Sequence, residues 1–307
     1  MSSLGTSGEA SAGPLTPTIG VFDSGFGGLT VLRALIERLP QARFAFLGDT
    51  ARLPYGSKSR RTIARYAAQS AQFLVREQGA EFLVIACNTA SALALDAIQD
   101  AVPVPVLGVI EPGASAARAA SRTGDVLVIA TEATVHSHAY SAACGAQGLR
   151  ALEKACPLLV PLVEEGWTDH PVTAEVIQIY LAELNADAAL AGLNPDTLLL
   201  GCTHYPLLRP LIERNLPAGM RVIDSAEAAA EAAVRFFGAK IDAGCPIPLA
   251  GSGQALSAPV AERVGENPAH PTEIRCFATD SVEKFERLGS RFLGRPVGKV
   301  ELVDLGG

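Results

Sequence analysis

The segment Phe82-Leu-Val-Ile-Ala-Cys87-Asn88-Thr89 places an apolar run and a small residue before a cysteine and two polar residues. The same order returns in Thr197-Leu-Leu-Leu-Gly-Cys202-Thr203-His204. Short continuous apolar runs are typical of strands that are buried on both faces of a parallel sheet. The repetition therefore predicts two similar halves, each with a cysteine at the carboxyl end of a strand.

Outward from these two segments, the chain alternates apolar runs with amphipathic stretches. Further strands are predicted at Thr18–Phe22, Arg43–Leu47, Val104–Val109 and Val126–Ala130. Between them, apolar residues at helical spacing predict helices over residues 29–39 and 63–74. Pro40 ends the first helix and Gly79 closes the second. This alternation predicts βαβ units, so the expected fold class is α/β with mainly parallel sheets.

The duplication predicts two similar α/β domains, related by a pseudo-twofold axis, with the active site in the cleft between them. We expect residues 18–110 and 224–307 to form the first domain and residues 111–223 to form the second. Residues 1–17 are rich in Ser, Gly, Thr and Pro, and we expect a disordered leader. Residues 238–272 are predicted to form a surface excursion before the closing segment Glu273–Leu293.

Composition excludes several classes of function. The 307 residues are 49% hydrophobic and 19% charged, which allows a sizeable core. The net charge of -7 gives no basic face for nucleic acid or for an anionic membrane, so neither is an expected partner. The leader lacks the apolar run of a signal peptide, and the six cysteines lack the close spacing of a disulfide framework. We therefore expect a cytoplasmic globular protein.

A glycine-rich loop, Asp23-Ser-Gly-Phe-Gly-Gly28, follows the first predicted strand. Its glycines allow a tight turn whose backbone N–H groups can donate hydrogen bonds to an anion at a helix start. For an isolated loop, the favoured interpretation is a turn with Asp23 or Ser24 as a helix cap. No Gly-Lys-Ser or Gly-Lys-Thr follows, so a nucleotide site is not supported.

The two repeated cysteines are predicted to be reactive bases. Each follows a strand and precedes a predicted helix, whose dipole favours a thiolate. Cys202 and His204 are too sparse a set for a zinc site, so no metal is expected. A Cys/His hydrolase needs one nucleophilic thiol and leaves Cys87 without a role. The remaining cysteines are expected to act as small apolar residues, namely Cys144, Cys156, Cys245 and Cys276.

Racemisation is a task that uses two bases, because a proton leaves one face of Cα and another arrives on the opposite face. We expect Asp23 to assist proton transfer at Cys87, and His204 to do so at Cys202. Asp23 has two rival roles, as a structural cap or as the partner of a substrate ammonium group. Hydrogen-bond donors are also needed for the substrate carboxylate, and the candidates are Ser24, Asn88, Thr89 and Thr203.

Four motifs together resemble the glutamate racemases of the aspartate/glutamate racemase superfamily: residues 23–30, 48–56, 86–90 and 201–206. The resemblance extends from about Ile19 to Phe237. It implies that Cys87 and Cys202 are the catalytic thiols. It also implies a substrate site lined by Asp23, Ser24, Tyr55, Gly56, Asn88, Thr89, Thr131, Thr134, Glu164, Thr203 and His204. The family more often has glycine where Ala130 stands, a departure that affects the flexibility of the loop.

The resemblance further implies a biological role. Such enzymes interconvert L-glutamate and D-glutamate without pyridoxal phosphate, metal or any other cofactor. They supply D-glutamate for peptidoglycan and are commonly homodimers. Two alternatives stay open from the residues themselves. One is a racemase of the same superfamily that acts on aspartate or another acid. The other is a small-anion binding protein that uses the Asp23 loop and has inert cysteines.

Overall fold

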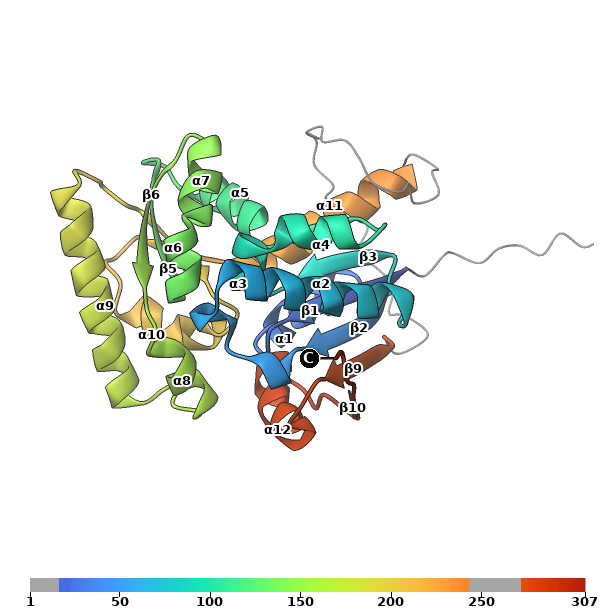
Figure 1. Ribbon diagram of the computed structural model, residues 1–307. Helices are drawn as coiled ribbons and strands as arrows, with labels where there is room; N and C mark the ends of the chain where they lie inside the picture. The colour runs from blue at the N-terminus through green and yellow to red at the C-terminus, as the bar shows by residue number, and fades with distance from the viewer. Residues whose placement is uncertain (1–16, 243–271, 307) are drawn as a thin grey trace, which may run out of the picture.

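The computed structural model describes residues 17–242 and 272–306, which form two parallel sheets flanked by helices (Figure 1). The first sheet has the strand order β10-β9-β2-β1-β3-β4. Its strands are β1 (Thr18–Asp23), β2 (Arg43–Gly48), β3 (Phe82–Ile85), β4 (Val106–Gly108), β9 (Ile274–Ala278) and β10 (Val300–Leu302). The second sheet has the order β6-β5-β7-β8. Its strands are β5 (Asp125–Ala130), β6 (Arg150–Ala155), β7 (Thr197–Gly201) and β8 (Arg221–Asp224). The α/β class with parallel sheets is thus confirmed.

The helices and short 3-10 turns connect these strands. The first half contains α1 (Leu29–Arg38), η1 (Thr50–Arg52), η2 (Tyr55–Ser57), α2 (Arg60–Arg76), α3 (Asn88–Leu93) and α4 (Leu95–Ala101). The next segment contains α5 (Ile110–Ala120), α6 (Glu132–Ser137), α7 (Ala139–Ala146), α8 (Leu159–Glu164), α9 (Pro171–Leu190), η3 (Tyr205–Leu208) and α10 (Arg209–Arg214). The chain then returns through α11 (Ser225–Asp242) and, beyond residue 271, α12 (Val282–Leu293).

The two sheets repeat one topology. The order β2-β1-β3-β4 in the first sheet matches β6-β5-β7-β8 in the second. The registers match as well, because Phe22 pairs with Ile85 in one sheet as Ile129 pairs with Leu200 in the other. Each cysteine of interest lies two residues beyond the second member of its pair. Cys87 and Cys202 therefore occupy equivalent positions in the two halves.

The predicted helices have clear sequence causes. Helix α1 buries Leu29, Leu32 and Leu35 along one stripe and ends before Pro40. Helix α2 begins where the Ser59 side chain accepts a hydrogen bond from the Thr62 backbone N–H. Both helices confirm the expected periodicity.

The sequence did not predict every element. Strand β6 is an edge strand that carries Arg150, Glu153 and Lys154 and has no fully buried residue, so it lacks an apolar run. Strand β4 is shorter than Val104–Val109. The expected excursion over residues 238–272 is wrong at its start, because α11 continues to Asp242. Residues 243–271 lie outside the described residues, as do residues 1–16 of the expected leader.

Helix α11 joins the two halves. It begins directly after β8 of the second sheet and packs against α1 of the first half and against α5 (Figure 1). One apolar core accordingly includes residues of both sheets, such as Val84 and Leu200. The boundaries of the two domains stay a prediction. Within the described ranges, no helix combines the length and apolarity needed to cross a membrane.

Candidate active site

The site is built on the carboxyl ends of equivalent strands. The loop after β1 carries Asp23 and Ser24, and the end of β3 leads into Cys87. In the second half, the end of β5 leads into Thr131 and the end of β7 into Cys202. Both cysteines are nearly buried, with exposed fractions of 5% and 6%. Parallel strands therefore deliver the candidate bases to loops, as the fold class predicts.

Cys87 lies in a polar but closely packed environment. Its Sγ donates to Ser24 Oγ at 3.3 Å and accepts from the Ala90 backbone N–H at 3.4 Å, which makes it the N-cap of α3. Burial, followed by the nearby charge of Asp23, raises the pKa of the Cys87 thiol to about 12. These two effects outweigh the helix dipole that was expected to favour a thiolate. Cys87 is therefore a protonated thiol at neutral pH.

Asp23 forms part of the loop and keeps one oxygen free. Its Oδ2 accepts from the Gly25 backbone N–H at 3.0 Å, whereas its buried Oδ1 has no hydrogen-bond partner among the described residues. Burial raises the pKa of Asp23, and the charge of His204 opposes that rise. The N-cap of α1 is Gly28, so neither Asp23 nor Ser24 caps this helix. The role of Asp23 as a helix cap is thus wrong.

Cys202 lies beside a histidine that belongs to a series of ion pairs. Its Sγ lies 3.9 Å from His204 Nδ1, and His204 Nε2 lies 3.4 Å from Glu164 Oε1 in an ion pair. Burial alone lowers the pKa of His204, but Cys202 and Glu164 raise it to about 10. Lys284 Nζ lies 3.4 Å from Glu164 Oε2. The ion pair with Glu164 therefore favours the protonated form of His204, which lies beside the Cys202 sulfur.

The segment after Cys202 differs from the expected helix. His204 precedes the 3-10 turn η3, and Thr203 Oγ1 lies 3.3 Å from His204 Nδ1. The close approach of Gly27 holds this segment in place, since a Cβ there would lie 2.6 Å from His204 Cε1. Thr30 Oγ1 also donates to the Thr203 carbonyl at 3.1 Å. The first half thus packs tightly against the loop of the second thiol.

Three threonines connect the two halves. Thr89 Oγ1 lies 3.0 Å from Thr131 Oγ1 and 3.1 Å from Thr134 Oγ1, and the last two are 3.0 Å apart. Gly56 faces the same group, because a Cβ at this glycine would lie 3.5 Å from Thr131 Cβ. These hydroxyl groups form a ring of donors and acceptors that can reorient toward a carboxylate.

Two of the expected binding residues are already engaged by protein groups. The Tyr55 hydroxyl donates its proton to Asp49 Oδ2 at 2.5 Å, so it can act toward a ligand only as an acceptor. Asn88 Oδ1 accepts from the Tyr140 hydroxyl at 2.6 Å. The Asn88 Nδ2 group is buried and has no partner among the described residues. The donor end of Asn88 is therefore available to a ligand.

Sequence reasoning missed several residues that shape this site. Tyr140 contacts Asn88, and Phe292 packs edge-on against His204 with ring centroids 5.0 Å apart. Lys284 donates a hydrogen bond to Glu164, the carboxylate that pairs with His204. Phe26 lies inside a quoted motif and packs against both His204 and Phe292. Of these four residues, only Phe26 could have been found from the sequence, because it lies in a motif. The other three lie far along the chain from either cysteine.

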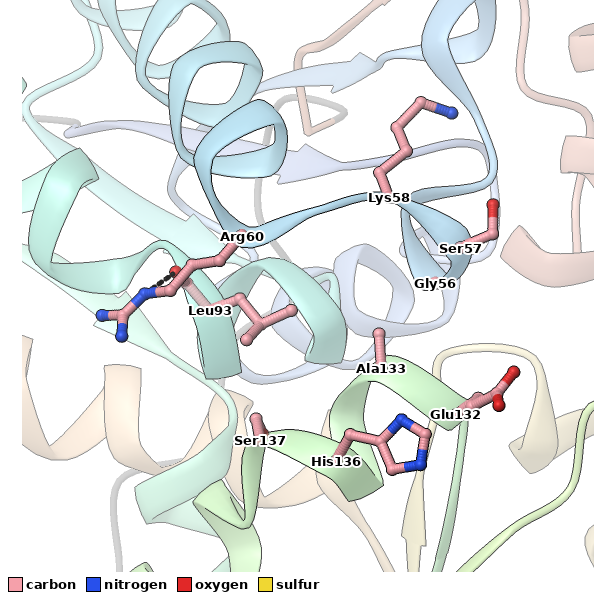
Figure 2. Close-up of a pocket in the computed structure, with 9 residues that line it drawn as sticks. All are labelled: Gly56, Ser57, Lys58, Arg60, Leu93, Glu132, Ala133, His136 and Ser137. Carbon is pink, nitrogen blue, oxygen red and sulfur yellow. Dashed lines mark hydrogen bonds between the residues drawn. The ribbon is translucent and has the colours of Figure 1, made fainter.

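A cavity of about 350 Å³ adjoins the site (Figure 2). One wall comes from η2 and the start of α2, the opposite wall from α6, and Gly56 belongs to both the cavity and the expected site. Figure 2 shows the Arg60 side chain extending past Leu93, and its Nε donates to the Leu93 carbonyl at 3.2 Å. Neither cysteine lines this cavity. The cavity is therefore separate from the two thiols, and residues of both halves line it.

Duplicated parallel sheets with an equivalent cysteine after β3 and β7 define the class of the protein, an α/β enzyme with paired thiols. The chain belongs to the Asp/Glu/Hydantoin racemase family, whose model matches residues 19–233. The glutamate racemase of Koribacter versatilis is 53% identical over 95% of this chain and 98% of its own.

Solved structures agree with this assignment. The Francisella tularensis glutamate racemase in complex with D-glutamate has a TM-score of 0.77 and 32% identity, over 94% of this chain and 98% of its own. The Thermus thermophilus glutamate racemase in complex with beta-chloro-D-alanine has a TM-score of 0.75 and 40% identity, over 94% of this chain and 97% of its own.

Proposed function

We propose that the protein is a glutamate racemase that works without a cofactor, with Cys87 and Cys202 as its two bases. The observation that carries this proposal is the equivalent placement of the two thiols in duplicated halves. Their neighbours differ, since Cys87 has a carboxylate nearby and Cys202 has an imidazolium. A two-base reaction needs one base without its proton and one with it at the start of each turnover. The neighbours of the two sulfurs support that pair of states.

In this mechanism the Cys202 thiolate removes the α-proton and the Cys87 thiol delivers its proton to the opposite face of Cα. The Cα–H bond breaks while an S–H bond forms on Cys202, and the electron pair is held by the substrate carboxylate. The S–H bond of Cys87 then breaks as the new Cα–H bond forms. The product state has a Cys87 thiolate, from which the reverse reaction begins. Asp23 and His204 are the groups that exchange protons with Cys87 and Cys202.

Two buried groups without a partner among the described residues support one orientation of an amino acid in the site. Asp23 Oδ1 is a buried acceptor, suited to a substrate ammonium group. Asn88 Nδ2 is a buried donor, suited to a carboxylate. The three-threonine group and Thr203 add further donors. Charge-assisted hydrogen bonds of this kind stabilise the negative charge that develops as the α-proton leaves.

The deciding experiment is circular dichroism of the purified protein with L-glutamate and no added cofactor. The ellipticity should decay to zero as the racemic mixture forms. The same assay with L-aspartate separates the nearest alternative, because a faster decay with aspartate would assign that substrate instead. Iodoacetamide labelling with and without glutamate separates the binding-protein alternative. Unreactive and unprotected thiols, together with constant ellipticity, would contradict the proposal.

We further propose that the protein acts in the cytoplasm as a homodimer and supplies D-glutamate for peptidoglycan. The relatives that carry the name glutamate racemase support the role. Exposed apolar side chains support the dimer: among the described residues, all large ones except Leu302 lie between Leu158 and Leu190. Sedimentation velocity of the wild type and of Ile179→Lys tests the dimer. A monomeric wild type would contradict it.

A further inference from the structure

Tyr140 is a buried tyrosine of α7 that reaches across to the first catalytic loop. Its hydroxyl donates to Asn88 Oδ1 at 2.6 Å, and its side chain has no exposed surface. Its ring fits tightly, because a Cβ at Gly201 would lie 2.8 Å from Tyr140 Cε2. The Tyr140 ring therefore has little freedom to move, so its hydroxyl stays in one position relative to Asn88.

The direction of this hydrogen bond determines which end of Asn88 is free. Burial raises the pKa of Tyr140, so the hydroxyl keeps its proton and can donate it. A carboxamide that accepts through Oδ1 must direct its Nδ2 group elsewhere. Asn88 Nδ2 is buried without a partner among the described residues, one position beyond Cys87. A buried donor without a partner is costly, which points to a ligand acceptor.

We propose that Tyr140 is a positioning residue: it locks the Asn88 carboxamide so that Nδ2 faces a carboxylate of the bound amino acid. The inference rests on the proposed function. Without the hydroxyl, the carboxamide can rotate by half a turn and present Oδ1 to a carboxylate, which repels it. Tyr140 touches no reacting atom, so its effect is on substrate binding more than on the chemical step.

The test is a double-mutant cycle with Tyr140→Phe and Asn88→Ala, assayed for KM and kcat with glutamate and for D-glutamate binding by calorimetry. Tyr140→Phe should raise KM roughly tenfold and weaken binding equally, with kcat changed less. In the Asn88→Ala background, the same substitution should have no further effect on KM, because the group that Tyr140 positions is gone.

The matched control is Tyr205→Phe, since Tyr205 is equally buried and its hydroxyl donates to the Cys156 carbonyl at 3.0 Å. It should lower the melting temperature as Tyr140→Phe does but leave KM unchanged. Multiplicative effects of Tyr140→Phe and Asn88→Ala would overturn the proposal, as would a wild-type KM in Tyr140→Phe. Racemisation by the wild type tests the function separately, so the two failures are distinguishable.

Discussion

The sulfur of Cys202 lies 3.9 Å from Nδ1 of His204. The equivalent position after Cys87 is Thr89, which cannot carry a charge. Conversely, Asp23 stands beside the first thiol where Ala130 stands in the second half. The duplicated fold thus places two identical thiols next to different groups. The asymmetry gives the two sulfurs different electrostatic surroundings, although their backbone positions are equivalent.

The first prediction concerns the pH dependence of stability that His204 confers. Its pKa is raised from 6.5 to about 10 in the folded protein. Its stabilising contribution is therefore complete below pH 6.5 and is lost as the pH rises through about 10. The free energy of unfolding should exceed that of His204→Gln by on the order of a few kcal/mol at pH 6, and by much less at pH 10. Urea unfolding of both proteins across this pH range measures the difference in free energy of unfolding. A difference that stays constant with pH would contradict the prediction.

The second prediction concerns the thiols. Cys87→Ala and Cys202→Ala should each abolish racemisation, because one face of the substrate loses its base. Cys276→Ala is the matched control, since Cys276 is equally buried but lies in β9 of the first sheet. This control should retain wild-type kcat. Polarimetry with both enantiomers measures the loss, and near-normal activity in either active-site variant would remove that cysteine from the mechanism.

The third prediction concerns Gly27, whose backbone runs against the loop of the second thiol. A Cβ at this position would overlap Thr203 Oγ1 and lie 2.6 Å from His204. Gly27→Ala should therefore displace His204 from Cys202 and lower kcat at least tenfold. In Gly145→Ala the new Cβ meets no atom within 4 Å, so that variant should retain full activity. Equal activity of the two variants would show that the close approach is irrelevant to catalysis.

The two cysteines could be predicted from sequence because each follows an apolar strand in a repeated local pattern. The edge strand β6 could not, since an edge exposed on one side needs no continuous apolar run. The contact between Tyr140 and Asn88 was also invisible, because it depends on how α7 packs against α3. The protonation state of Cys87 needed the structure too. The helix position of Cys87 suggested a thiolate, and the burial of its sulfur together with the nearby charge of Asp23 reverses that expectation.

The fourth prediction concerns a buried carboxylate at the start of α11. Burial raises the pKa of Asp224 from 3.8 to about 6, although Asp224 Oδ1 accepts from the Ala226 backbone N–H at 2.8 Å. The folded protein is therefore more stable when the Asp224 carboxyl is neutral. This stabilisation is complete below pH 3.8 and is lost as the pH rises through 6. Asp224→Asn keeps an acceptor and removes the charge. It should raise the free energy of unfolding by roughly 1–3 kcal/mol at pH 7 and by little at pH 4. An unchanged or lower stability at pH 7 would contradict this.

The last prediction separates two bases from one by following the proton. If one thiol removes the α-proton and the other delivers a solvent-derived proton, early turnover in heavy water should place deuterium almost wholly in the product enantiomer. The remaining substrate should stay protiated, because the base that removed its proton does not return a deuteron before product forms. A single base that removes and returns the proton would wash deuterium into the starting enantiomer, or would carry the original proton into the product. The measurement is mass spectrometry of the separated enantiomers at low conversion, starting from each enantiomer in turn. Equal early labelling of both enantiomers would exclude the two-thiol mechanism even while the protein racemised glutamate.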